Sequence, residues 1–435
     1  MPVPTGRLAA ATAFLSLAVL VLPWRPGLTL LVVDGALVAV AGVDWLAAVR
    51  PASLGLRRSV PAIVTLGERA ELEWSVSNPS RRTVRATLTD RLVPSLRAST
   101  RRFRVTVTPG AAGGARATLA PQRRGRFVLG EVTVRVAGPL GLVARQVRRA
   151  VPGTLRVYPA FASRKEAELR LERARVQELG LRSARGRGGG TAFEALREYG
   201  PDDDFRRIDW AATARRDVPI VRTYRAERNQ RVLLLLDCGR VMAGRCDGVP
   251  RLEHAMDAAL LITVVAGRLG DRVGLLAFDD DVRAAVGPAA GGRPLPRITE
   301  AMYQLEPSLV ESDYRGAFAR TLAQWHRRAL LVLFTELTEA AVEEGLLPAL
   351  PLIARDHVVV IAAVRDPAVE AWSGESPTDA AIAYRRAAAS AALEERRRTV
   401  ARLRALGAAV VDAEPGRLAP ELADAYLDLK ATGRL

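Results

Sequence analysis

The first 50 residues most restrict the fold of this 435-residue chain, because they are almost wholly apolar. One apolar run extends from Leu8 to Leu22, a turn with two prolines and a glycine follows, and a second run extends from Leu28 to Val49. A helix needs about 20 apolar residues to cross the roughly 30 Å core of a bilayer. The pattern predicts a transmembrane helical hairpin over residues 1–50, with helices at about 8–22 and 28–49 and with Trp24 and Trp45 near the interfaces.

Arginines flank the hairpin unevenly: Arg7 precedes it, three follow it between positions 50 and 58, and the turn carries one. We therefore expect the chain to be anchored in the cell membrane. By the positive-inside rule, both ends of the hairpin and the large C-terminal part should lie on the cytoplasmic side. A competing interpretation is a secretory signal peptide over residues 1–23. Against it, its N-terminal region has a single Arg and no small-x-small cleavage site follows Leu22.

Two carboxylates, Asp34 and Asp44, interrupt the second apolar run. Carboxylates inside a membrane are costly, so each could be functional. We expect Asp44 to lie near a membrane interface, and Asp34 to face the partner helix or a neighbouring subunit.

The positive charge of the chain is concentrated in one stretch. Of the formal net charge of +17, residues 51–160 supply +15, from 20 Arg against five acidic residues, whereas residues 161–435 have 41 basic and 40 acidic residues. Such a field favours an anionic partner, either lipid headgroups or nucleic acid, although a solvated Arg-rich exterior is the alternative. Aromatic residues for base stacking are scarce there, so membrane lipids are favoured and no nucleic acid is expected.

Residues 51–160 contain short runs, such as 103–107 and 132–136, in which apolar and polar residues alternate. Asn-Pro, Pro-Gly and Gly-Gly pairs separate these runs. Regular short strands with turn punctuation predict a small antiparallel β-sandwich. Arg104 and Arg135 fall between apolar neighbours, so we expect them to project from the solvent face.

Residues 161–230 read as a linker with a glycine-rich connector over 186–190 and an unusual acidic and Arg-rich motif. Carboxylates and guanidinium groups interleave there with Tyr and Trp, which predicts either a clasp of bidentate ion pairs or a docking surface for a partner. No His or Cys accompanies them, so no catalytic residue is assigned. The residues of this interaction motif are Arg197, Tyr199, Pro201, Asp203, Asp204, Arg206, Ile208, Asp209 and Trp210.

Residues 231–435 alternate strand-like and helical segments, which predicts a doubly wound, mostly parallel α/β domain. Ligands of such sheets bind outside the carboxyl ends of the strands, where Asp237, Asp279 to Asp281 and Glu336 fall. The expected strands are 231–237, 272–278, 329–335, 358–364 and 408–411, with a helix over Leu252 to Leu269.

The chain resembles the bacterial domain-of-unknown-function family fifty-eight. The resemblance rests on the interaction motif, on a following von Willebrand factor A-like domain, and on the upstream runs Arg123 to Gly130 and Pro139-Leu140-Gly141-Leu142. One departure is Asp202, where the family usually has Gly. The family has no established biochemical activity. The resemblance implies a partner role with MoxR-type AAA+ ATPases and other von Willebrand factor A proteins in the assembly or maturation of other proteins.

The resemblance also raises the question of a metal site, because an A-type domain can bind a divalent ion through D-x-S-x-S, a Thr and a later Asp. Here the first motif reads Asp237-Cys238-Gly239-Arg240-Val241, Ser312 takes the Thr position and Glu336 takes the Asp position. Three oxygen ligands suit a hard cation poorly. We therefore expect no metal and no cofactor at this degenerate site, and Arg240 to pair with Asp237 or Glu336 in place of the ion.

These observations predict a membrane-anchored, non-catalytic scaffold for protein interaction, and not an enzyme. Two alternatives stay open: a metal-dependent A-domain with adhesion or hydrolase-like activity, and a membrane protein that binds anionic lipid.

Overall fold

The computed structural model describes residues 1–21, 26–172, 192–200, 205, 208–225, 229–288, 294–432 and 435, with only the backbone given at 18–21, 26, 192–195, 197 and 222–225. The protein is mixed α/β and divides into two units, Met1–Tyr158 and Pro159–Leu435. Each unit is described by itself. The predicted glycine-rich connector at 186–190 lies outside the described residues.

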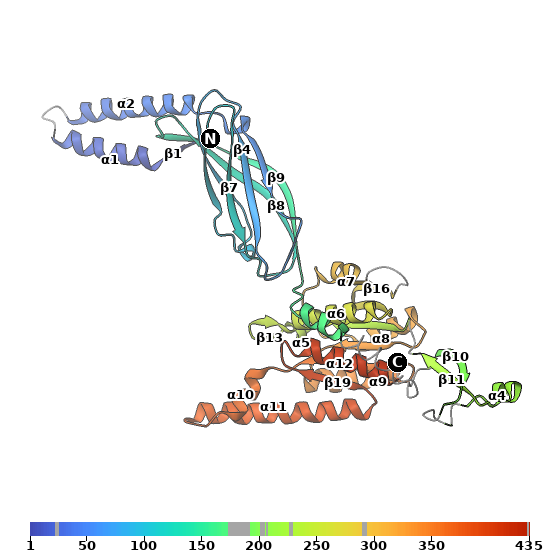
Figure 1. Ribbon diagram of the computed structural model, residues 1–435. Helices are drawn as coiled ribbons and strands as arrows, with labels where there is room; N and C mark the ends of the chain where they lie inside the picture. The colour runs from blue at the N-terminus through green and yellow to red at the C-terminus, as the bar shows by residue number, and fades with distance from the viewer. Residues whose placement is uncertain are drawn as a thin grey trace. The chain divides into compact units, whose positions relative to one another are not determined.

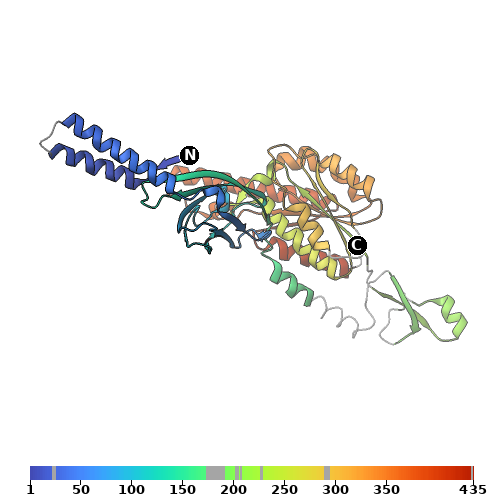
Figure 2. The same ribbon diagram turned by 90° about the horizontal axis from the view of Figure 1, so that it is seen from above.

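Two apolar helices, α1 (Gly6–Val21) and α2 (Pro26–Ala47), belong to the first unit and run side by side (Figures 1 and 2). Both predicted helices are therefore present. Only one segment, Gly27–Ser53, is long and apolar enough to span a membrane among the described residues, whereas Gly6–Leu17 is shorter. This supports membrane anchoring weakly, because a signal sequence passes the same test of length and composition. Trp24 lies outside the described residues.

The remainder of the first unit consists of two β-sheets around one hydrophobic core. The larger sheet has the strand order β1-β9-β8-β5-β6, with β3 paired to β9, and the smaller has the order β2-β4-β7. All of these pairings are antiparallel except that of β3 with β9. The strands are β1 (Pro2–Pro4), β2 (Gly55–Ser59), β3 (Ile63–Thr65), β4 (Ala70–Ser77), β5 (Val84–Asp90), β6 (Arg102–Val107), β7 (Ala112–Leu119), β8 (Gly125–Ala137) and β9 (Val143–Tyr158).

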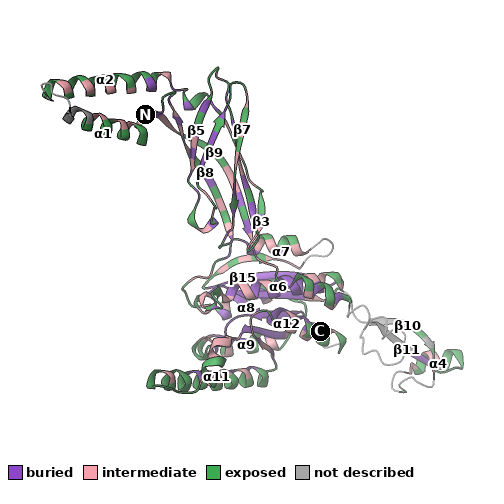
Figure 3. Ribbon diagram, turned by 60° about the vertical axis from the view of Figure 1, so that its left-hand side comes forward, coloured by how far each residue is buried: buried purple, intermediate pink, exposed green. Residues whose placement is uncertain are grey.

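Alternation along the strands builds this core, because successive side chains of a strand point to opposite faces. In β6 every second residue is buried, so that Phe103 and Val105 point inward and Arg104 is exposed, as predicted. Figure 3 shows the same division, with buried residues on the strands and mostly exposed residues on α1 and α2.

One arginine breaks the expected solvent-facing pattern. Arg58 pairs with Asp90 at 3.0 Å, both side chains being 1% exposed, and its guanidinium lies 5.3 Å from the ring centroid of Trp74. The indole Nε1 of Trp74 also donates to Asp90 at 3.2 Å. Burial raises the pKa of Asp90 above its ordinary value, although Arg58 acts in the opposite direction. Part of the basic charge of this stretch is thus internal.

A six-stranded sheet in the order β16-β15-β12-β17-β18-β19 forms the centre of the second unit. Five strands are parallel and the edge strand β16 is antiparallel to β15. The strands are β12 (Arg231–Asp237), β15 (Arg272–Phe278), β16 (Val282–Val286), β17 (Leu330–Phe334), β18 (Val358–Val364) and β19 (Ala409–Ala413). All five strands expected from the sequence are present, and β16 is an additional one.

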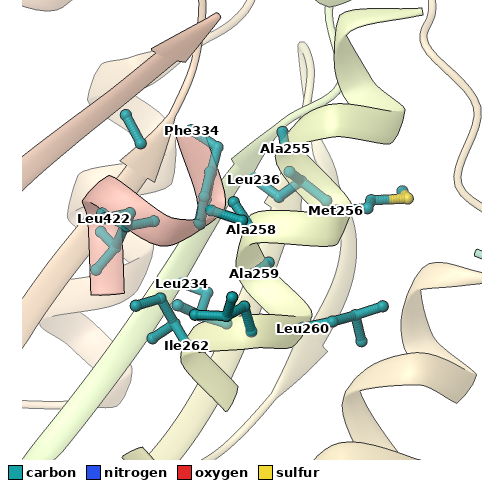
Figure 4. Packing of buried hydrophobic residues seen from close by; sticks show 14 of the residues in the cluster. Leu234, Leu236, Ala255, Met256, Ala258, Ala259, Leu260, Ile262, Phe334 and Leu422 are labelled. Atoms are coloured by element: carbon teal, nitrogen blue, oxygen red, sulfur yellow. The ribbon is translucent and has the colours of Figure 1, made fainter. Parts of the chain in front are cut away.

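Helices cover both faces of this sheet, and β12, which is apolar between its terminal residues Arg231 and Asp237, buries alternate residues on each side. Leu234 and Leu236 pack against α6 on one face (Figure 4), whereas Leu233 and Leu235 join the cluster beneath α8 and α9. The helices are α5 (Arg240–Ala243), α6 (Arg251–Arg268), α7 (Pro294–Met302), α8 (Tyr314–Gln324), a π-helical turn (Ala341–Leu346), α9 (Leu347–Ala354), α10 (Pro367–Gly374), α11 (Ala380–Ala405) and α12 (Leu418–Ala431). A short β-hairpin joins β13 (Arg245–Cys246) to β14 (Val249–Pro250).

A separate two-stranded sheet pairs β10 (Ala192–Glu198) with β11 (Ile220–Arg225) and carries the short helix α4 (Trp210–Arg216) between them. The interaction motif predicted from the sequence falls on this element, which we call the motif hairpin (residues 192–225).

Candidate functional site

The motif hairpin holds the described part of the interaction motif. Arg197 lies in β10, where it pairs in register with Val221, and the backbone N–H of Tyr199 donates to the carbonyl of Pro219 at 2.8 Å. Ile208 forms an isolated antiparallel bridge with Val221. Four motif residues lie outside the described residues: Pro201, Asp203, Asp204 and Arg206.

Asp209 has a local structural role. Its carboxylate is the N-cap of α4, accepting from the N–H groups of Ala211 and Ala212 at 3.1 Å, and its own N–H donates to the carbonyl of Ile220 at 2.8 Å. An N-cap satisfies N–H groups that have no partner inside the helix. The motif carboxylate therefore fixes the start of α4, and with it the position of Trp210.

Trp210 and Phe205 form an exposed aromatic pair on the motif hairpin. Their ring centroids are 5.6 Å apart and the planes meet at 69°, an edge-to-face contact. Trp210 is nevertheless 60% exposed and Phe205 65% exposed. Two large apolar side chains that pack on each other and remain accessible are characteristic of docking surfaces rather than of a core.

The carboxyl edge of the central sheet gathers the predicted metal-site residues around Asp237. The first carboxylate oxygen, Oδ1, accepts from the hydroxyl of Ser312 at 2.5 Å and from the N–H of Gly239 at 2.8 Å. The second, Oδ2, accepts from the hydroxyls of Thr335 at 2.6 Å and Tyr314 at 2.9 Å. A carboxylate has about four acceptor positions. All four are taken by groups of the same chain.

Asp237 is fully buried, which shapes its ionisation. Burial raises its pKa above the ordinary value, against the opposing effect of its four hydrogen bonds. Burial, together with the charge of Asp237, also raises the pKa of Tyr314 well above its ordinary value. The sequence pattern predicted Asp237 and Ser312 at this edge, but it missed Tyr314 and Thr335, whose hydroxyls complete the set.

Glu336 belongs to a different group of charges at the same edge. It pairs with Arg396 and, at 3.1 Å, with Arg251, while Arg396 also holds Asp412 at 2.8 Å. The prediction that Arg240 pairs with Asp237 or Glu336 was wrong, because Arg240 forms its ion pair with Glu311 on the surface. Arg251 at the start of α6 and Arg396 of α11 reach Glu336 from elements distant in sequence.

The geometry of this edge suits a closed structural network. Within the described ranges, no three His, Cys, Asp or Glu side chains gather closely enough to hold a metal ion. Asp237, Ser312 and Glu336 do lie at one edge, but Ser312 donates to Asp237, and the two carboxylates are engaged by hydroxyl, backbone N–H and guanidinium groups of the chain itself.

Asp44 forms a second site, in the first unit, which the sequence did not reveal. Its buried carboxylate accepts from the backbone N–H groups of Leu140 at 2.7 Å, Leu142 at 2.8 Å and Val143 at 3.0 Å. The end of α2 is thereby fixed to the β8–β9 turn. Asp34 is exposed on α2. The only sequence signal for the Asp44 contact was the Pro139-Leu140-Gly141-Leu142 run.

Comparison with known families agrees with the motif. Residues 195–376 match the sequence model of the family described as "Protein of unknown function DUF58". Uncharacterized proteins of Mycobacterium bovis and Mycobacterium tuberculosis are 29% identical over 183 residues, or 41% of this chain. The match spans 56% of those relatives' own length.

Comparison with solved structures gives two weak similarities. The CARDB domain of a Pyrococcus furiosus protein has a TM-score of 0.19 and 14% identity, covering 24% of this chain and 87% of that chain. A β-glucosidase from Listeria innocua has a TM-score of 0.13 and 15% identity, covering 24% of this chain and 16% of that chain. TM-scores this low carry no conclusion about the fold or function.

Proposed function

Residues 195–376 belong to the DUF58 family, and on that premise we propose that the chain is a membrane-anchored, non-catalytic scaffold whose motif hairpin docks a protein partner. The proposed partner is a MoxR-type AAA+ ATPase that assembles or matures other proteins. The second unit serves as a von Willebrand factor A-like interaction domain that carries the hairpin.

The observation that carries this proposal is the exposed pair of Phe205 and Trp210. Tryptophan is enriched among the residues that dominate binding energy at protein interfaces, where it fills a pocket of the partner. Asp209 fixes Trp210 at the first position of α4, so the side chain is presented from an ordered helix and loses little freedom on binding.

The carboxyl edge supports a docking mode that needs no metal ion. The four acceptor positions of Asp237 are filled by its own chain, which leaves this carboxylate no free position for a metal ion. The same edge presents Leu309, which is 81% exposed, close to Ser308 and Ser312. This edge is the second place on the unit where a partner could bind.

Membrane anchoring is proposed from α2 and from the hydrogen bonds that join its C-terminal end to the β-sheets of the same unit. Arg82 donates to the carbonyl of Ala47 at 3.0 Å, and Arg145 donates to that of Trp45 at 2.8 Å. These bonds satisfy carbonyls that have no partner within the helix at its C-terminal end. The arginine distribution favours an orientation with both ends of the helical hairpin, and the domains that follow it, in the cytoplasm.

Recovery of the partner from membranes tests the proposal. The full chain, tagged at its C-terminus, is purified from its own bacterial membranes, and any AAA+ ATPase that copurifies is quantified. Trp210→Ala is expected to reduce recovery at least about tenfold, because truncation of one central aromatic side chain costs about 2 kcal/mol or more. Trp372→Ala is the matched control, since Trp372 is also an exposed tryptophan, 42% exposed, on α10.

Leu309→Glu separates the two docking surfaces. If the motif hairpin carries binding, Leu309→Glu recovers as much ATPase as the unchanged chain. Loss of binding in Leu309→Glu with full binding in Trp210→Ala would move the interface to the carboxyl edge. Failure to recover an AAA+ ATPase with the unchanged chain would refute the proposed partner.

A further inference from the structure

A cavity of about 260 Å³ lies at the amino end of the central sheet, opposite to the carboxyl edge that holds Asp237. It opens between the starts of β12, β15 and β17. Its lining is mostly basic among the described residues: no acidic side chain lines it, and the α-carboxylate of Leu435 is the anionic group present. Four arginines contribute to it: Arg231, Arg272, Arg327 and Arg328.

Two of these arginines are placed directly opposite each other. Arg231 begins β12 and Arg272 begins β15, and they are register partners on adjacent parallel strands. Like charges at directly opposed positions of a sheet are destabilising. The chain keeps this pair although residues 161–435 as a whole are nearly neutral, with 41 basic and 40 acidic residues. The α-carboxylate of Leu435 is the anionic group beside them among the described residues, and one carboxylate against four arginines leaves a surplus of positive charge in the cavity.

A carboxylate just before β15, that of Asp271, is already engaged. Asp271, which precedes Arg272, accepts from the phenol of Tyr426 and from the ammonium of Lys430, both at 2.5 Å. Arg272 keeps a buried Nε that has no hydrogen-bond partner in the described part of the chain. This nitrogen has almost no accessible surface, so Arg272 offers an anion its charge and not a hydrogen bond from Nε.

Hydrogen bonds hold the mouth of the cavity in shape before any ligand arrives. The N–H of Arg272 donates to the carbonyl of Gln230 at 2.8 Å, and the N–H of Asn229 donates to that of Gly270 at 3.3 Å. Asn229 has a φ of 74°, in the left-handed region that asparagine tolerates better than most residues. Gln230 also donates from Nε2 to the main-chain oxygen of Leu435 at 3.5 Å.

We propose that this cavity is a binding site for the phosphate groups of a small diphosphate or triphosphate compound. Arginine is suited to phosphate because its planar guanidinium donates two parallel hydrogen bonds to two oxygens. The volume lies just below the range of about 300–1,000 Å³ that is usual for sites of small organic ligands. A pyrophosphate group fits within it, and the remainder of a nucleotide would extend outward.

Calorimetric titration of the full chain in nanodiscs of neutral lipid tests the site, with inorganic pyrophosphate as the probe. Binding is expected in buffer of constant ionic strength. Arg231→Gln/Arg272→Gln is expected to weaken it by about a hundredfold, because removal of each charge-assisted hydrogen bond should cost about tenfold in affinity. The matched control is Arg386→Gln, which removes an exposed arginine of α11 and should leave the affinity unchanged.

Thermal unfolding gives a second readout that does not depend on measuring heat. Without ligand, Arg231→Gln/Arg272→Gln should unfold at the same temperature as the unchanged chain or higher, because two opposed charges are removed. Pyrophosphate should raise the unfolding temperature of the unchanged chain and not that of the double variant. A double variant that is folded and binds pyrophosphate normally would overturn the proposal.

The source of the phosphate is resolved by competition. ATP should displace pyrophosphate, whereas chloride at equal ionic strength should not. Vesicles of phosphatidylglycerol should not displace pyrophosphate either, since the proposed ligand is a soluble compound. Displacement by these vesicles but not by ATP would overturn the assignment in favour of a lipid headgroup. The site is independent of the proposed partner, because Trp210→Ala should bind pyrophosphate normally.

Discussion

Asp44 and Gly138 lie in direct contact, so closely that a Cβ on Gly138 would overlap the Asp44 carboxylate. The carboxylate can therefore reach the N–H groups of Leu140, Leu142 and Val143 only because position 138 has no side chain. The contact between Asp44 of α2 and Gly138 of the β8–β9 turn thus links the apolar N-terminal segment to the β-sheets.

Gly138→Ala should destabilise the first unit by displacing the Asp44 carboxylate. We expect a decrease of about 2 kcal/mol in the free energy of unfolding, measured by chemical denaturation of the full chain in nanodiscs. The control is Gly130→Ala, because a Cβ at Gly130 meets nothing within 4 Å. Since both changes affect the same bonds, Gly138→Ala should cost much less when Asp44 is already Ala. If Gly138→Ala lowered the free energy of unfolding equally with Asp44 and with Ala at position 44, the two residues would not be coupled.

Asp44→Ala should leave three backbone N–H groups without an acceptor, at a cost of about 3 kcal/mol. Proteolysis of the β8–β9 turn in membranes measures this, and cleavage should become faster. The comparison is Asp34→Asn, which changes an exposed carboxylate on the same helix and should leave the cleavage rate unaltered.

Arg396→Ala should be among the most damaging changes in the second unit. Its side chain is 14% exposed and joins Glu336 to Asp412, so truncation leaves two poorly solvated carboxylates. We expect a decrease of about 3–5 kcal/mol in the free energy of unfolding. Its neighbour Arg397 is 75% exposed and pairs with Glu394 on the surface, so Arg397→Ala should cost less than about 1 kcal/mol. Similar decreases for the two variants would show that the network contributes little.

Asp237 should make stability depend on pH in a direction opposite to that of a salt-bridged carboxylate. Its pKa is raised in the folded state, so folding favours the protonated form. Stability is then fully present below the unfolded pKa of about 4 and decreases as the pH rises toward the raised folded pKa.

Asp237→Asn removes this titration, and unfolding measured from pH 3 to pH 8 isolates it. The stability of the unchanged chain relative to Asp237→Asn should be greatest near pH 3–4 and should decline at higher pH. A difference that stays constant, or that grows with pH, would mean that hydrogen bonding outweighs burial at this carboxylate.

The two cysteines should react slowly with thiol reagents while the protein is folded. Both are buried and neither forms a disulfide with the other, and burial raises the pKa of Cys246 to about 11, with Asp366 and Asp247 acting in the same direction. Only about one thiol in a thousand would then be ionised at pH 8, and the thiolate is the reactive form. Colour development with a disulfide reagent should be slow in buffer and rapid for both thiols in urea.

Much of the fold was accessible from the sequence because the strands of the second unit are short, apolar and bounded by polar residues. The runs at 231–237, 272–278 and 358–364 agree with β12, β15 and β18 to the residue. β16 was missed since Val282–Val286 has two Ala and a charged residue, a composition with little preference for a strand.

The sites could be predicted less well, because the residues that bind Asp237, Glu336 and Asp44 come from distant parts of the chain. Local spacing placed Asp237 at a strand end but did not reveal that Tyr314 and Thr335 would fill its second oxygen. Among many arginines, nothing local distinguishes Arg396, which reaches Glu336, from Arg240, which does not. Asp44 was expected at an interface, but the N–H groups that it binds lie about 100 residues further along the chain.

The pairing of β1 with β9 has a consequence for how the protein is made. The N-terminal amino group donates to the carbonyl of Gln146, 145 residues away. At roughly 5–20 residues per second, about 7–30 s separate the synthesis of these two partners. The helices α1 and α2 lie between β1 and β9 in the chain, so both are synthesised before this edge of the larger sheet can form. Slowing translation between α2 and β9 should therefore lengthen the time for which the first strand stays open to mispairing.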